Sequence, residues 1–111
     1  MILMNLEEMK KKLKTYTEEQ IILREHTLIR CFQREITREL IFTNLLKPEK
    51  LIDVIEEEPR HKEEKKFKLV FELSRNKSFI IVISSNKELN IITSVIRYRK
   101  WIRPIDLREG R

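Results

Sequence analysis

The sequence predicts an α+β domain in which N-terminal helices pack on one face of a small, mostly antiparallel sheet of four strands. Two observations predict this class. Up to Pro48 the apolar residues recur at the spacing of a helix, and after Pro48 they alternate with polar residues as in strands. The expected strands are joined by short turns, over 75–77 and 86–88, which suit antiparallel neighbours. A length of 111 residues is sufficient for a single domain with one core, spanning 1–111.

Helices are expected over 3–13, 18–33 and 38–46. Thr17 with Gln20 is a capping-box pair that predicts the start of the second helix, and Thr37 is the expected cap of the third. Pro48 ends the third helix, because the residue before a proline avoids the α conformation. The residues expected to face the core are Leu3, Leu6, Met9 and Leu13 in the first helix, Ile21, Ile22, Leu28, Ile29 and Phe32 in the second, and Leu40, Ile41, Asn44 and Leu45 in the third.

Strands are expected over 51–57, 67–73, 78–85 and 89–99. The first ends in acidic residues, which is typical of an edge strand, and a polar loop over 56–66 follows. The second alternates apolar and polar residues, whereas the third is apolar on both faces, as in a central strand. Beyond the fourth, Trp101 and Ile102 are expected to pack on the domain, and residues 103–111 are expected to fray.

The composition indicates where the protein works. Charged residues make up 38% of the chain, alanine is absent and glycine occurs once. This bias is typical of heat-adapted intracellular proteins, which favour ion-pair networks and short loops. The N-terminal segment is too short and too charged for a signal peptide, and no window approaches the length of a membrane span. We therefore expect a soluble, cytoplasmic protein that does not enter a membrane.

Several kinds of site are excluded by residue type. Cys31 is the only cysteine, so no intrachain disulfide can form, and we expect it to be a small buried hydrophobe. His26 and His61 lack partners at zinc-binding spacing. No glycine-rich loop is present to hold a nucleotide. We expect no metal and no cofactor.

The net charge of +6 is unevenly distributed. Four lysines lie between Met9 and Lys14, and six basic residues against two acidic ones lie between Arg97 and Arg111. Two such clusters could converge in the fold and attract a polyanion. Alternatively, they serve only the solubility of a heat-adapted surface.

His26, Arg30 and Arg34 are four residues apart, so a helix places them on one stripe, one turn after another. The stripe runs beside the apolar positions Ile22, Ile29 and Phe32. A histidine and two arginines at the edge of an apolar face could hold a phosphate or act in acid–base chemistry. They could equally form ion pairs.

The order of these features resembles a set of small prokaryotic domains similar to the RelE and BrnT toxins, which belong to the barnase–EndoU–colicin–RelE class of ribonuclease folds. The resemblance covers Thr17 to Arg99. The residues that carry it are His26, Arg30, Arg34, Ile36, Thr37, Lys68 to Glu72 and Ile91 to Thr93. The helix over 1–14 and the tail over 103–111 lie outside it.

Two positions depart from the family pattern. The pattern usually has glycine after the second arginine, where it serves a left-handed helix cap, and this chain has Glu35. Glu35 therefore predicts that the helix ends differently or runs on. In the family pattern, an aromatic residue often follows soon after the threonine of the last strand, and this chain has none soon after Thr93.

The resemblance implies a RelE-like fold and a toxin-like domain that binds RNA or cleaves it without a metal. His26 would move a proton, and Arg30 and Arg34 would hold the scissile phosphate. On the last strand, Arg97 and Arg99 would hold flanking phosphates. Tyr98 and Lys100 lie on its other face and complete a basic strand with aromatic residues nearby, as a sheet-based RNA binder needs.

Alternatives remain at each of these positions. His26 could pack between Ile22 and Ile29, and the two arginines could pair with Glu39 or with the acidic residues 56–58. Tyr98 and Trp101 could pack on the first helix. The domain as a whole could be a non-catalytic interaction module, in which residues 1–14 and the open sheet face bind a protein partner, as an antitoxin would, or a second copy.

Overall fold

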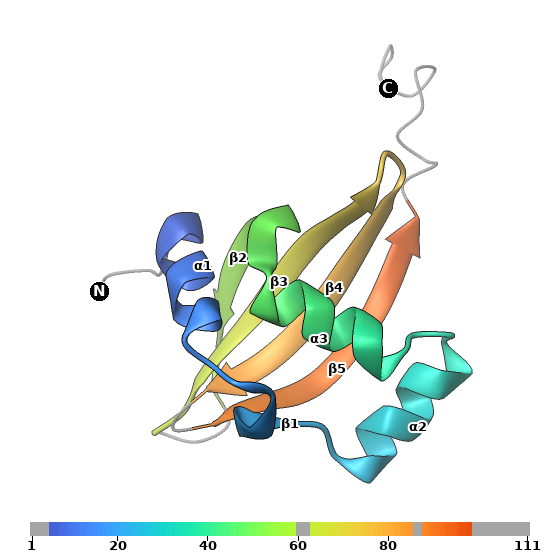
Figure 1. Cartoon of the computed structure of the whole chain (residues 1–111), viewed down its shortest axis with the longest axis horizontal. Helices are drawn as coiled ribbons and strands as arrows, with labels where there is room; N and C mark the ends of the chain where they lie inside the picture. The colour runs from blue at the N-terminus through green and yellow to red at the C-terminus, as the bar shows by residue number, and fades with distance from the viewer. Residues whose placement is uncertain (1–4, 60–62, 86–87, 99–111) are drawn as a thin grey trace.

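The structure is a computed structural model that describes residues 5–59, 63–85 and 88–98. It confirms the α+β class (Figure 1). In chain order the elements are α1 (Leu6–Lys14), η1 (Glu18–Gln20), β1 (Ile21–Ile22), α2 (Glu25–Gln33), α3 (Arg38–Leu46), η2 (Pro48–Lys50), β2 (Leu51–Glu57), β3 (Lys65–Ser74), β4 (Lys77–Ser85) and β5 (Leu89–Tyr98).

The sheet has five strands in the order β1-β5-β4-β3-β2, rather than the four expected. The additional strand is β1, which runs parallel to β5 and pairs Ile21 with Leu89 and Ile22 with Asn90. All other neighbouring strands are antiparallel. Strand β2 is confirmed as an edge.

The helix expected over 18–33 is wrong in its first part. The capping pair is present, since the Thr17 amide donates to Gln20 Oε1 at 2.9 Å, but it caps only the three-residue η1. The chain then extends into β1, and α2 begins at Glu25. Two consecutive β-branched isoleucines gain more from pairing with β5 than from a further helical turn.

One face of the sheet carries the core. Figure 1 shows α1 and α3 over this face, with α1 beside β2, whereas α2 lies next to β5. The side chains at the centre are at most 1% exposed, and each contributes about 1.5–3 kcal/mol by its burial. They are Met9 and Leu13 from α1, Ile41 and Leu45 from α3, Phe67, Leu69 and Phe71 from β3, and Phe79, Ile81 and Ile83 from β4.

The first helix is therefore used inside the domain. It begins at Leu6, after an Asn5–Glu8 capping box, and it buries Met9 and Leu13 completely. Leu3 lies outside the described residues. The described part of α1 therefore packs its apolar residues Met9 and Leu13 within the domain, where they offer no surface to a partner.

The third helix agrees with the sequence at both ends. The Thr37 hydroxyl accepts from the Leu40 amide at 3.0 Å, and α3 ends before Pro48. Asn44 is buried as expected, and its side-chain amide donates to the Leu40 carbonyl at 2.8 Å. A buried amide therefore has a partner within its own helix.

The second helix presents the opposite side to the one expected. Its buried residues are Thr27 and Cys31, whereas Leu28, Ile29 and Phe32 are 38%, 51% and 84% exposed. Cys31 Sγ lies 3.1 Å from the Ser94 hydroxyl oxygen on β5. The small side chains allow this close approach, and the large apolar ones are left outside.

The end of α2 also corrects the sequence interpretation. Glu35 has a φ of 60°, so it adopts the left-handed conformation for which the family pattern has glycine. The Ile36 amide donates to the Cys31 carbonyl at 2.8 Å and the Glu35 amide to the Phe32 carbonyl at 3.0 Å. These two bonds form a Schellman motif. It turns the chain sharply into α3 and buries Ile36.

Candidate nucleic-acid interface

The cationic stripe is present on α2 and its cap. His26, Arg30 and Arg34 are all exposed, and successive members are separated by a rise of about 6 Å along the helix. Within the described residues, none of the three takes part in an ion pair, and the one pair observed there joins Lys66 to Glu57 at 3.9 Å. Among the described residues, the arginines therefore do not form the alternative ion pairs with Glu39 or with the acidic end of β2.

Arg34 is partly committed to the fold. Its Nη1 donates to the Ser94 carbonyl oxygen at 2.7 Å and to the Thr93 hydroxyl at 3.2 Å. These bonds fix one nitrogen of the guanidinium against the outer edge of β5. The other nitrogens of the fork remain as donors, so Arg34 is both an anchor and a source of positive charge.

His26 lines a cavity of about 270 Å³ at the N-terminus of α2. Arg24 is the N-cap of this helix and makes no side-chain cap bond. The first amides of a helix lack partners within it, so this end favours an anion. The described side chains around the cavity are those of Arg24, His26, Thr27, Glu64, Ser84, Asn90, Ile91 and Ile92.

This cavity is lined by groups that can donate hydrogen bonds to an anion and by one carboxylate. Arg24, His26 and the Asn90 amide can donate to an anion, and the Ser84 hydroxyl lies beside them, only 2% exposed. Glu64 is the single acid of the lining, and it has an interaction of its own. Neither Arg30 nor Arg34 lines the cavity. The imidazole and the two guanidinium groups therefore share an exposed line rather than one enclosed pocket.

Arg97 extends the cationic surface along β5. The strand pairing places it on the same sheet face as Val95 and Thr93. It is exposed, about 13 Å along the strand from the Thr93 hydroxyl that Arg34 binds. Tyr98 lies on the other face, 55% exposed, with Lys77 Nζ 5.3 Å from its ring centroid. Arg99, Lys100 and Trp101 lie outside the described residues.

Arg24, Ser84 and Asn90 were not found from the sequence. Arg24 immediately precedes α2, but the capping pair at Thr17 had predicted that this helix starts earlier in the chain. Ser84 and Asn90 come from strands that meet only through the β4–β5 pairing, in which they are directly opposite. The one sequence signal that could have indicated this region is the pair Ser84 and Ser85 at the end of the apolar strand.

Two further observations bear on the chemistry. In the part of the chain that the structure describes, no three His, Cys, Asp or Glu side chains are grouped so that they could hold a metal ion. None of the described helices is both long enough and apolar enough to span a bilayer.

Comparisons with family models, with curated proteins and with solved structures find no match to this chain. The resemblance to RelE- and BrnT-like domains therefore stays a prediction from the sequence pattern.

Proposed function

We propose that this domain binds single-stranded RNA along the surface formed by α2 and β5, as a RelE/BrnT-like toxin component would. The observation that carries the proposal is the stripe of His26, Arg30 and Arg34, exposed and outside any ion pair among the described residues. Unpaired cations in a row suit a phosphodiester backbone, because each neutralised phosphate releases a counterion.

Each cation has a distinct part in this proposal. Arg30 is exposed, and no hydrogen bond or ion pair to the described residues occupies its guanidinium, which is therefore available for a bidentate phosphate contact. Arg24, His26 and the first amides of α2 receive a second phosphate at the cavity. Arg97 holds a flanking phosphate, Tyr98 offers an exposed ring for a base, and Arg99 and Lys100 continue the basic run.

The proposal includes a cleaving form that needs no metal. The ribose 2′-oxygen attacks the neighbouring phosphorus, the bond from phosphorus to the 5′-oxygen breaks, and His26 accepts the proton of the 2′-hydroxyl. Arg30, one helical turn from His26, stabilises the charge that gathers on the phosphate oxygens in the transition state, and Arg34, one turn further on, holds the next phosphate. Water protonates the departing 5′-oxygen.

Binding is tested by the fluorescence anisotropy of a labelled single-stranded oligoribonucleotide at several salt concentrations. Arg30→Ala should weaken binding and reduce the slope of log K against log salt by about 1. Lys11→Ala is the matched control, since it removes an exposed cation from α1, which is a separate helix beside β2. Equal losses from both variants, or no salt-dependent binding by the unmodified protein, would refute the proposal.

Cleavage is tested separately, by electrophoresis of the same RNA after incubation with the protein in excess EDTA. The cleaving form predicts products that disappear with His26→Ala while Arg30-dependent binding remains. If the protein binds the RNA but the RNA stays intact, the cleaving form is refuted and only the binding function is retained.

A second candidate, a protein-interaction module, is favoured by a different observation. Leu28, Ile29 and Phe32 form an exposed apolar surface on α2. This surface replaces the first helix as the place where such an interaction would occur.

A further inference from the structure

The exposed residues Leu28, Ile29 and Phe32 form what we call the α2 patch. Phe32 is 84% exposed, the highest fraction among the large apolar residues described as exposed, and Ile29 is 51% exposed. Sheet packing uses the other side of the helix, through Thr27 and Cys31. A contiguous apolar surface that the described part of the domain leaves exposed is characteristic of a binding site for another surface.

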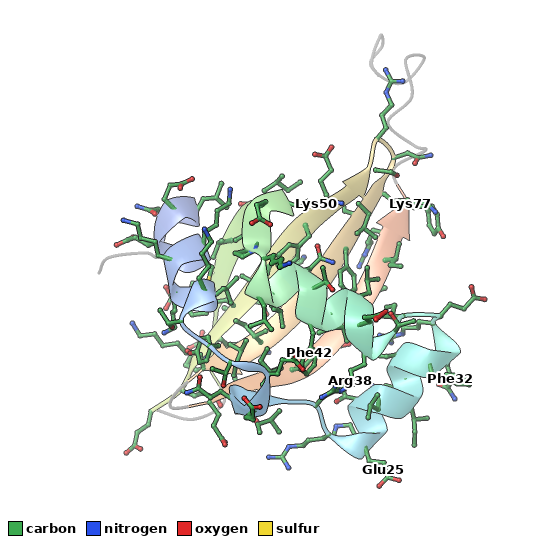
Figure 2. The ribbon with its side chains drawn as sticks, viewed as in Figure 1. Glu25, Phe32, Arg38, Phe42, Lys50 and Lys77 are labelled. Atoms are coloured by element: carbon green, nitrogen blue, oxygen red, sulfur yellow. The ribbon has the colours of Figure 1, made fainter. Side chains whose placement is uncertain are left out.

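A hollow lies directly beside the projecting ring. A cavity of about 520 Å³ is lined by Leu28, Phe32, Glu35, Ile36, Thr37 and Arg38. Figure 2 labels Phe32 on α2 and Arg38 at the start of α3, the two elements that form its walls. The Schellman turn at Glu35 creates this hollow, because it directs α3 away from α2 immediately after Ile36.

We propose that the α2 patch binds a second copy of this chain about a twofold axis, with each Phe32 inserted into the hollow of its partner. A twofold interface uses the same surface on both copies, so this surface must carry both the projecting group and its receptor. Phe32 and the hollow are such a pair, and they lie side by side.

The charges at the rim of the hollow agree with a self-complementary surface. Glu35 and Arg38 both line it, one of each sign. In the proposed dimer, Glu35 of one copy lies near Arg38 of the other, twice in each dimer. Each Arg38 guanidinium also lies over the ring of its own Phe42, 4.2 Å from the centroid. A partner surface that carried charges of only one sign would instead be attracted by either Glu35 or Arg38 and repelled by the other.

The dimer and the RNA surface do not compete for α2. At 100° per residue, the stripe of His26, Arg30 and Arg34 and the α2 patch point in directions that differ by about 150°. The dimer proposal does not depend on RNA binding. Salt also separates the two, because the apolar burial of Phe32 persists in salt that weakens phosphate contacts.

The test is sedimentation equilibrium of the full chain from low to high micromolar concentration. We expect a monomer–dimer equilibrium that persists at high salt, because apolar burial supplies most of its stability. Phe32→Ser should weaken the dimer about a hundredfold or more, because two buried rings are lost. Ile55→Ser, which removes a 41% exposed isoleucine from β2, should leave it unchanged. The proposal is overturned by a monomeric wild type, by open-ended larger assemblies, or by an unaffected Phe32→Ser dimer.

A charge exchange tests the twofold arrangement. Glu35→Arg alone places two arginines together at each contact, and Arg38→Glu alone places two glutamates together, so each variant should be more monomeric than the wild type. An equimolar mixture should recover the dimer, because each contact then joins opposite charges. A mixture that stays as monomeric as its components overturns this arrangement.

Discussion

Arg34 Nη1 donates to the Ser94 carbonyl oxygen at 2.7 Å and thereby fixes the C-terminal end of α2 to the outer edge of β5. In the described sheet, β1 pairs with β5 only at Leu89 and Asn90. Among the described residues no strand lies beside the rest of this edge, and such edges invite pairing with another chain. A charged side chain on the Ser94 carbonyl protects the edge and holds the cationic stripe in place.

Replacing Arg34 should therefore affect stability as well as RNA binding. Arg34→Ala removes two hydrogen bonds from a charged donor, and because the side chain is exposed we expect a loss of about 1 kcal/mol in the free energy of unfolding. Arg30→Ala, which breaks no bond within the described residues, should remain within about 0.5 kcal/mol of the wild type. Urea denaturation measures both. Equal midpoints for the two variants would remove the anchoring role of Arg34.

Replacing the left-handed residue at the end of α2 should increase the stability of the domain. Glu35→Gly removes the steric conflict of a side chain at a φ of 60° and should raise the free energy of unfolding by about 1 kcal/mol. Gln33→Gly is the matched control, since it places the same residue in an exposed helical position, where it should cost about 1 kcal/mol. Thermal melting of both variants checks the signs. A destabilising Glu35→Gly would show that the glutamate side chain has a compensating role.

The close approach of α2 to β5 depends on a small side chain at position 31. Cys31→Leu should destabilise the domain by about 1–3 kcal/mol, because Cys31 is 2% exposed and its sulfur lies 3.1 Å from the Ser94 hydroxyl oxygen. Cys31→Ala, which creates no overlap, should cost less. Chemical denaturation compares them, and a leucine variant as stable as the alanine variant would show that α2 is free to move outward.

The cap of α3 provides a local test of the fold. Thr37→Ala removes the acceptor of the Leu40 amide and should lower the free energy of unfolding by about 1 kcal/mol. Thr43→Ala, on the exposed side of the same helix, should be neutral or slightly stabilising because alanine is the better helix former. Hydrogen exchange of the first amides of α3 should accelerate only in the Thr37 variant.

The sequence was sufficient for the elements whose signals are local. The bounds of α3 follow from Thr37 and Pro48, and β3, β4 and β5 follow from strand periodicity and short turns. The hydrophobic pattern also identified the central strand correctly, since β4 lies between β3 and β5.

The errors arose where a distant partner decides the outcome. The pairing of Ile21 and Ile22 with β5 interrupts the helix, and nothing near them in the sequence encodes that strand. On α2 the periodicity identified an apolar side but not whether the domain would cover it, and Thr27 and Cys31 face the sheet instead. The cationic stripe was predictable from spacing alone, whereas the cavity at His26 required the β4–β5 register that sets Ser84 opposite Asn90.

The most direct test of the RNA-binding surface is an NMR titration of the ¹⁵N-labelled domain with a short single-stranded oligoribonucleotide at low salt. We expect amide shifts that saturate with the oligonucleotide and cluster at His26, Arg30 and Thr93, with α1 and β2 unchanged. Shifts confined to α1 and β2, or no saturable shifts at all, would contradict the assignment of α2 and β5 as the interface.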